Sequence, residues 1–269
     1  MGRAKDIILK PISAKEGNVL VRRVHYSGKV DPRSQLHIGV FYHGSLEGAM
    51  QFGPSIDKRK AQGLVSDTPW NGWLDLHRLA FTDRLPRNSE SRAIGIAVRM
   101  INKYRPHVQW ILSYADATQC GDGTIYRASG FVLTGINANK SMWRMPDGNV
   151  ICKIVLEPGF ASGNAGPKSI KARYGKTGSE TSTAFLKKIG AEPIPGFQLR
   201  YIYFIDPTAR ERLTVPIVPF SEIEKRGASM YRGEKIRAGS IASDATAIHA
   251  EEGGATPTPA LQNDDHKCS

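Results

Sequence analysis

Asp116 stands where an apolar, β-prone run of residues opens onto a loop rich in glycine. The run Val108–Ala115 predicts a buried strand, and Gly121 and Gly123 allow the chain to turn sharply after it. A strand with a carboxylate at its carboxyl end, followed by a tight loop and a short helix, is a common active-site arrangement in α/β folds. Asp116 and Tyr126, which lies in the predicted short helix beyond the loop, are therefore the first candidates for chemistry.

A second cluster of reactive side chains is His25-Tyr26-Ser27, in which three adjacent residues can transfer protons, bind a ligand or form hydrogen bonds. The alternative is an ordinary solvated segment. Arg78 lies inside the predicted strand Leu74–Phe81, where a cation is costly unless it is paired. Arg78 therefore has either a carboxylate partner, such as Asp116, or a ligand in front of it.

The junction Phe81–Ser91 leads from a predicted strand through a basic loop into a helix. Unpaired amides at the start of that helix, the hydroxyls of Ser89 and Ser91, and the nearby Arg84 and Arg87 would suit a pyrophosphate group. The alternative is ordinary helix capping beside solvated arginines. A Walker A loop at Gly175-Lys176-Thr177 is excluded, because isoleucine stands where that motif requires its first glycine.

The charge of the chain predicts a polyanionic partner. The 269 residues carry a formal net charge of +12, with a pI of about 9.7, and such a balance is typical of nucleic-acid-binding proteins. Residues 232–269 contain no aromatic residue and hold four basic against six acidic side chains, so that residues 1–231 alone carry +14. We expect a disordered tail over 232–269. The sequence has no apolar run of 18 residues, and we expect no membrane contact.

The order of the predicted elements indicates one α/β domain over residues 1–231. The sheet is expected to be mixed and largely antiparallel, with helices beside it. Ile56–Asp67 is expected to be a basic loop. The predicted helices are Asn18–Tyr26, with Asn18 as its cap, Ser89–Tyr104, capped by Asn88 or Ser89, Thr124–Ser129, capped by Asp122, and Ala184–Ile189. The predicted strands are Ile7–Leu9, Leu36–Tyr42, Leu46–Phe52, Leu74–Phe81, Val108–Ala115, Phe131–Thr134, Val150–Leu156 and Leu199–Ile205.

Six short segments carry a resemblance through their order and spacing. They are His25–Gly28, Glu47–Gly53, Arg78–Phe81, Asn88–Ser91, Tyr114–Asp116 and Gly123–Phe131. Together they resemble the Mom family of bacteriophage DNA-modification proteins, over roughly residues 15–220. The resemblance implies a divergent Gcn5-related N-acetyltransferase (GNAT) fold. It also implies an enzyme that acts in the host cell cytoplasm on double-stranded DNA, converts adenine to N6-(carbamoylmethyl)adenine and protects the phage genome from restriction.

The resemblance also assigns roles to residues. It implies catalytic positions at His25, Tyr26, Arg78 and Asp116, with Tyr126 as a further candidate. Acetyl-CoA or a related acyl donor would be held by Arg84, Arg87, Ser89 and Ser91, although the segment Arg87–Arg92 lacks the glycines usual in acetyltransferases. Since an exocyclic adenine amine is a poor nucleophile, a metal is a further hypothesis. His25, Tyr26 and Asp116 offer the mixed nitrogen and oxygen donors that iron accepts.

Two other functions stay open at this point. One is a DNA-binding protein that keeps an acetyltransferase-like fold without catalysis. The other is an ordinary acyl-CoA N-acetyltransferase that acts on a small amine or on a protein.

Overall fold

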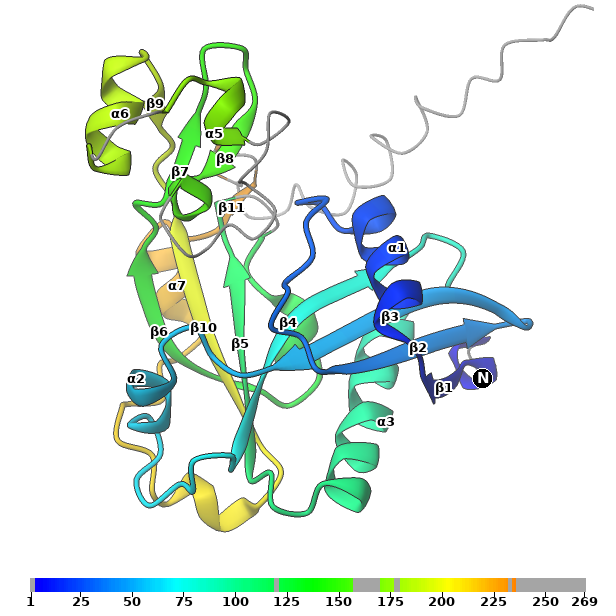
Figure 1. Ribbon diagram of the computed structural model, residues 1–269. Helices are drawn as coiled ribbons and strands as arrows, with labels where there is room; N and C mark the ends of the chain where they lie inside the picture. The colour runs from blue at the N-terminus through cyan, green and yellow to red at the C-terminus, as the bar shows by residue number, and fades with distance from the viewer. Residues whose placement is uncertain (1–2, 119–120, 157–169, 177–179, 232–233, 236–269) are drawn as a thin grey trace, which may run out of the picture. The chain divides into compact units, whose positions relative to one another are not determined.

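A seven-stranded mixed sheet forms the centre of the computed structural model (Figure 1), which describes residues 3–118, 121–156, 170–176, 180–231 and 234–235. The strand order is β1-β2-β3-β4-β5-β10-β6, and all neighbours are antiparallel except β4 and β5. This confirms the mixed, largely antiparallel sheet expected from the sequence. The strands are β1 (Ile8–Pro11), β2 (Leu36–Tyr42), β3 (Ser45–Gly53), β4 (Trp73–Phe81), β5 (Trp110–Asp116), β6 (Val132–Ala138) and β10 (Phe197–Phe204).

Strands β2 and β3 form an antiparallel hairpin. His43 and Gly44 form its turn and both have positive φ angles, of 47° and 81°. Two successive positive φ angles match the right-handed twist of the flanking strands, and glycine adopts such an angle without steric cost.

Strands β4 and β5 are parallel but pair only over their first four residues, from Trp73↔Trp110 to Leu76↔Ser113. Beyond that point β4 continues against β3 as far as Phe81, and β5 continues against β10 as far as Asp116. Figure 1 shows the two strands separating towards their carboxyl ends. The sheet is therefore open between the ends of its two central strands.

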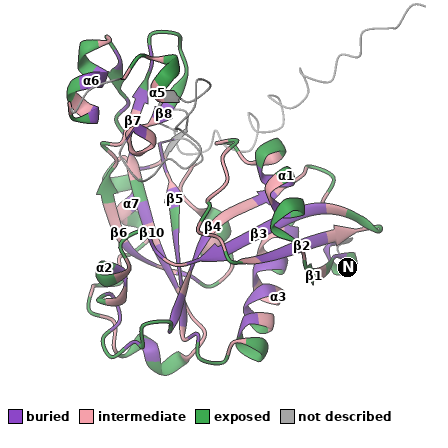
Figure 2. Ribbon diagram, viewed as in Figure 1, coloured by how far each residue is buried: buried purple, intermediate pink, exposed green. Residues whose placement is uncertain are grey.

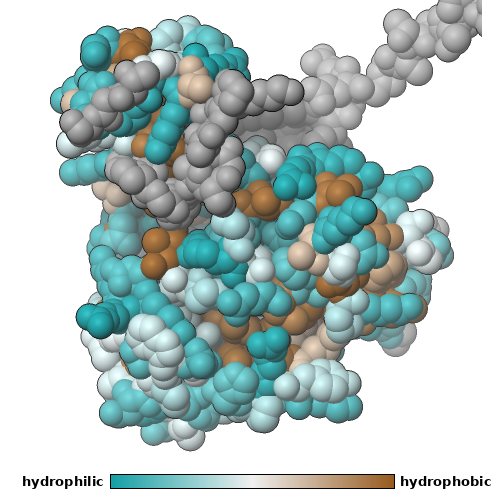
Figure 3. Space-filling model, viewed as in Figure 1, coloured by the Kyte–Doolittle hydropathy of each residue, from teal (hydrophilic) through white to brown (hydrophobic). Residues whose placement is uncertain are grey.

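Two helices cover opposite faces of the sheet. α1 (Ala14–Val24) packs Leu20 and Val21 against Ala49 and Ala80. α3 (Ser89–Tyr104), predicted with the correct bounds, belongs to the main core cluster, which includes Met50. Because successive strand residues point to opposite faces, neighbouring Ala49 and Met50 face different helices. Figure 2 shows the sheet as the most buried layer, and Figure 3 shows apolar patches on an otherwise mostly polar face.

The predicted start and cap of the first helix were wrong. Ser13 caps α1, and Ser13 and Glu16 form a reciprocal capping box, a pattern visible in the sequence as Ser-x-x-Glu. Asn18 instead accepts a hydrogen bond from Gln51 Nε2 at 2.8 Å. The cap of α3 also differs, because Asn88 has a left-handed φ of 69° and its side chain makes no capping hydrogen bond.

Several shorter elements were missed or placed differently. The expected loop Ile56–Asp67 contains α2 (Lys58–Gln62), and the expected strand Val150–Leu156 divides into β8 (Val150–Cys152) and η2 (Lys153–Leu156). A second sheet has the order β8-β7-β9. The remaining elements are η1 (Arg3–Asp6), α4 (Thr124–Ala128), β7 (Met142–Arg144), α5 (Ile170–Arg173), α6 (Ser182–Lys188), β9 (Glu192–Pro193), η3 (Pro207–Arg210), α7 (Ser221–Lys225), β11 (Met230–Tyr231) and β12 (Glu234–Lys235).

The predicted domain boundary after residue 231 falls within the β11–β12 pair. Apart from 234–235, the predicted tail lies outside the described residues, and its disorder stays a prediction.

Candidate functional site

The carboxyl ends of β4 and β5 carry two of the residues that the sequence singled out. Arg78 lies two residues beyond Leu76, the last β4 residue that pairs with β5, and Asp116 is the final residue of β5. In α/β proteins, ligands bind beyond the carboxyl ends of adjacent parallel strands. The gap between these strands is therefore the natural centre of a site.

Arg78 is largely buried and makes its hydrogen bonds to backbone carbonyls. Nε donates to Lys29 O at 2.7 Å, and Nη1 donates to His77 O at 2.6 Å. Burial lowers the pKa of Arg78, while the carboxylate of Asp31 and, to a smaller extent, the hydroxyl of Tyr26 raise it. Asp31, rather than the suggested Asp116, is thus the carboxylate that acts most strongly on Arg78. The backbone contacts hold the guanidinium in a fixed position at the site.

His25 follows the end of α1 and is electrically neutral. Burial, with a smaller contribution from the positive charge of Arg78, lowers the pKa of His25 to about 3. The backbone N–H of Ser27 lies 3.2 Å from His25 Nδ1. Because an amide can only donate, Nδ1 accepts and the single imidazole proton lies on Nε2. His25 therefore offers a hydrogen-bond donor at Nε2.

Two tyrosines flank the arginine. The Tyr26 ring lies 4.3 Å from the His25 ring, and Tyr26 remains 54% exposed. Tyr126 packs against Phe131 and Tyr201, with ring centroids 5.3 Å apart in each case. Both tyrosine hydroxyls lie close enough to Arg78 to influence its pKa. The structure thus brings His25, Tyr26, Arg78 and Tyr126 into one cluster.

Asp116 is half-buried at the opposite side of the gap. Its Oδ1 accepts hydrogen bonds from Thr118 N at 3.0 Å and from Asn139 Nδ2 at 3.3 Å. Burial raises the pKa of Asp116, although the bonds from Thr118 and Asn139 oppose that change. A carboxylate whose pKa is raised is a better proton acceptor.

Lys29 and Cys152 lie between Asp116 and the arginine cluster, and neither was predicted from the sequence. Lys29 acts electrostatically on Cys152 and on Arg78, and Asp116 raises the pKa of Cys152. Burial is the main cause that lowers the pKa of Lys29 and raises that of Cys152. A signal for Lys29 existed, because it follows His25–Gly28 directly. Cys152 had none, since only the fold brings β8 to this place.

The predicted anion site at the start of α3 has mixed support. Ser89 is fully buried, and within the described part of the chain its Oγ has no hydrogen-bond partner. Ser91 Oγ donates to Asn88 O at 3.3 Å, and Arg84 pairs with the buried Glu47 at 3.2 Å. Arg87 is exposed. The first-turn amides of a helix have no acceptor within that helix, so this end can still hold an anion.

The metal hypothesis gains no support. Within the described ranges, no group of three or more His, Cys, Asp or Glu side chains is arranged to hold a metal ion. His25 Nδ1 is also engaged by Ser27. The structure therefore gives no support to the hypothesis that His25, Tyr26 and Asp116 bind iron.

Comparison of the sequence with known families identifies the group to which it belongs. Residues 6–222 match the Mom protein family. The chain belongs to the Mom family. The Methylcarbamoylase mom of Escherichia phage Mu is 31% identical over 215 residues, which cover 80% of this chain and 82% of that relative. The family predicted from six short segments is thus confirmed.

Solved structures that match this Mom-family chain include several acetyltransferases. A GNAT-family protein of Desulfovibrio desulfuricans has a TM-score of 0.38 at 11% identity and covers 74% of this chain and 99% of its own. The ribosomal-protein-S18-alanine N-acetyltransferase of Escherichia coli has a TM-score of 0.39 at 10% identity, with coverages of 74% and 94%. A Bacillus subtilis acetyltransferase solved with CoA has a TM-score of 0.39 at 10% identity and coverages of 74% and 97%.

In the described part of the chain, none of the helices is long and apolar enough to cross a membrane.

Proposed function

We propose that this protein is a transferase that converts adenine in phage DNA to N6-(carbamoylmethyl)adenine and thereby protects that DNA from host restriction. One observation carries the proposal. In a chain that shares 31% identity with a methylcarbamoylase, His25, Tyr26 and Tyr126 lie near Arg78, on the strand that separates from the one ending at Asp116.

The target nitrogen lies inside the base stack of duplex DNA, so the adenine must be flipped out of the helix. An extruded base needs an aromatic surface and hydrogen-bond donors. Tyr26, which is half exposed beside His25, supplies the aromatic surface. The charge of +14 on residues 1–231 holds the phosphates on either side.

Asp116 is the proposed general base. The product carries a methylene carbon on N6, so a nitrogen–carbon bond forms while N6 loses a proton and the leaving group departs from that carbon. Plain acetyl transfer would give an amide at N6 instead. An exocyclic amine is a weak nucleophile, and a carboxylate whose pKa is raised by burial removes its proton more readily as the bond forms.

His25 and Arg78 supply hydrogen-bond donors, whereas Asp116 accepts a proton. His25 presents Nε2–H, and Arg78 presents those guanidinium protons that Lys29 and His77 do not use. Donors fixed in advance stabilise negative charge that develops on a carbonyl oxygen or on a leaving group. We assign both residues to binding the transferred two-carbon unit.

The start of α3 fits a phosphate-bearing acyl donor such as acetyl-CoA. Among the described residues, the buried hydroxyl of Ser89 has no hydrogen-bond partner. Ser91 lies in the first turn of α3, and Arg84 and Arg87 lie in the loop before it. For the bond to N6 to form, the two-carbon unit of such a donor would carry a leaving group on its methylene carbon, which acetyl-CoA itself does not, so a related acyl compound fits the step. The residues of this chain would hold its phosphates by helix amides and hydroxyls.

Mass spectrometry of nucleosides tests the proposal. DNA from cells that express the protein, and DNA from cells that express Asp116→Ala, are digested and compared. A carbamoylmethyl-deoxyadenosine mass that depends on Asp116 supports the proposal. Unmodified DNA in both samples would indicate a binding protein instead, and an acetylated amine or protein beside normal DNA would indicate an ordinary acetyltransferase.

A further inference from the structure

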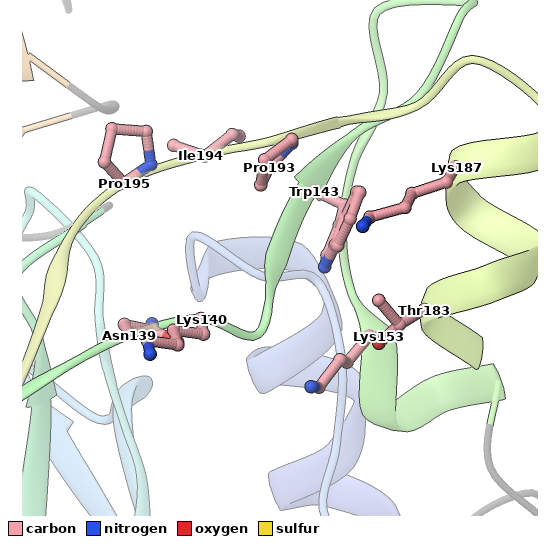
Figure 4. Close-up of a pocket in the computed structure, with 9 residues that line it drawn as sticks. All are labelled: Asn139, Lys140, Trp143, Lys153, Thr183, Lys187, Pro193, Ile194 and Pro195. Carbon is pink, nitrogen blue, oxygen red and sulfur yellow. The ribbon is translucent and has the colours of Figure 1, made fainter. Parts of the chain in front are cut away.

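A pocket of about 410 Å³ lies in the part of the fold built on β7, β9 and α6, outside the cluster described above. Figure 4 shows Trp143, Lys153, Thr183 and Lys187 on one side and Asn139 and Lys140 across from them. The segment Pro193–Pro195 forms an apolar wall. None of the residues assigned to the chemistry above lines this pocket.

The polar lining consists mainly of hydrogen-bond donors. Lys140, Lys153 and Lys187 place three ammonium groups around the pocket, and none of its nine lining residues is acidic. On the same helix, by contrast, Lys188 lies 3.9 Å from Glu180. Ammonium groups can only donate, and clustered positive charges repel one another unless an anion lies between them.

Trp143 provides an independent sign of a missing acceptor. The residue is only 4% exposed, and its indole Nε1 has no hydrogen-bond partner among the residues that the structure describes. A buried donor without an acceptor costs about 1–3 kcal/mol, and such groups are rare in native proteins. Because Trp143 lines the pocket, a ligand with an acceptor oxygen would satisfy this nitrogen.

Asn139 joins the pocket to the site. It lines the pocket, and its Nδ2 donates to Asp116 Oδ1 at 3.3 Å. A DNA strand held in the pocket would therefore be separated from Asp116, the proposed general base, by the side chain of Asn139 alone. A small anion would satisfy the lysines equally well, but a continuous strand also uses the apolar wall and the position next to Asp116.

We propose that this pocket binds a backbone phosphate of the DNA strand that carries the target adenine. The inference rests on the proposed function, since it takes DNA as the substrate. Lys153 and Lys187 contact the phosphate oxygens, Trp143 Nε1 donates to one of them, and Pro193–Pro195 packs against the adjoining sugar. The pocket would thus set the register of the strand relative to Asp116, because phosphate contacts fix position rather than sequence.

Binding of a labelled short duplex, measured by fluorescence anisotropy across a range of salt concentrations, tests the inference. Lys153→Gln/Lys187→Gln should weaken binding about tenfold at moderate salt and reduce the log–log salt slope by about 0.9 for each phosphate that is no longer neutralised. Lys103→Gln/Lys188→Gln removes the same charge from exposed positions outside the pocket and should change both values little. Trp143→Phe keeps an aromatic ring but removes the donor, so it should weaken binding with an unchanged slope. Equal melting temperatures confirm that the variants are folded.

Two outcomes would overturn the pocket assignment. In one, the two double variants lose affinity equally or not at all. In the other, the tryptophan fluorescence of the wild type responds to inorganic phosphate alone and not to the duplex. Nucleoside mass spectrometry on the wild type decides the proposed function separately, so a protein that modifies DNA without using this pocket would be recognised as such.

Discussion

The backbone amide of Ser27 donates to Nδ1 of His25 across 3.2 Å, and this contact places the imidazole proton on Nε2. The arrangement depends on a two-residue separation within the segment that follows α1. It explains how a residue that could act as an acid or a base is held as a neutral donor beside Arg78.

The neutrality of His25 has a consequence for the pH dependence of stability. Its pKa is about 3 in the folded protein against an ordinary value of 6.5, so between these values the unfolded chain binds more protons. His25 therefore favours folding fully above pH 6.5, and this contribution is lost as the pH falls towards 3. We expect the free energy of unfolding, measured by denaturant titration, to fall less for His25→Gln than for the wild type as the pH is lowered from 6.5 to 4. Parallel curves for the two proteins would contradict the neutral state.

Asp75 should make the protein less stable as the pH rises, whereas His25 makes it less stable as the pH falls. Burial is the main cause that raises its pKa from 3.8 to about 7, and Ser55 Oγ donates to its carboxylate at 2.6 Å. The folded protein thus holds an extra proton, and stability falls as the pH rises from about 4 through 7. With about 1.4 kcal/mol for each pKa unit, the loss is about 4 kcal/mol. Asp75→Asn should remove this dependence between pH 5 and 9, as seen in the melting temperature, and a variant that still shows it would argue against Asp75.

Asp116→Asn should abolish DNA modification and leave the fold intact. Asparagine keeps the size of the side chain and can accept the hydrogen bond from Thr118, but it cannot take a proton at neutral pH. Loss of a general base lowers the rate by roughly 10²–10⁴-fold. The rate of nucleoside modification and the melting temperature should be measured together. An active Asp116→Asn protein would return this residue to a structural role.

Gly196 should be sensitive although it lies outside the site. A Cβ at this position would lie 2.0 Å from Thr118 Oγ1, and Thr118 holds Asp116 through its amide. Gly196→Ala should destabilise the protein by about 1–3 kcal/mol through overpacking and should also reduce modification. Gly95→Ala is the matched control, because its Cβ meets nothing closer than 3.8 Å, and it should stabilise α3 by about 0.5–1 kcal/mol. Equal melting temperatures for the two variants would refute the steric argument.

DNA binding as a whole should depend strongly on salt. The described fold lies within the part of the sequence that carries +14, and log affinity should fall with log salt at about −0.9 for each phosphate neutralised. Filter binding between low and physiological salt measures the slope. A flat dependence would contradict a DNA-binding role.

The parts of the fold with a strong periodic signal were predictable. β2, β3, β4 and α3 agree closely with their predicted bounds, because each is long and its pattern reports a buried face. α1 was misplaced because the capping box at Ser13 and Glu16 was overlooked in favour of Asn18. Individual site residues could be proposed from their types, but their grouping could not. Cys152 and Lys29 are far apart in sequence, and only the packing of β8 near the segment after α1 brings them together.

The short pairing of β4 with β5 makes this the least connected place among the inner strands of the central sheet. Four consecutive residue pairs join the unit β1–β4 to the unit β5-β10-β6, whereas the neighbouring pairs β3–β4 and β5–β10 remain bonded along most of their lengths. Fewer backbone pairs therefore join these two halves of the sheet than join β3 to β4 or β5 to β10. A ligand that forms hydrogen bonds to residues on both strands beyond their last pair would add a further connection between β4 and β5. Binding of a ligand at the site should then slow amide hydrogen exchange at Trp110–Ser113, the β5 residues that pair with β4. These residues lie earlier in the strand than Asp116, which would contact the ligand.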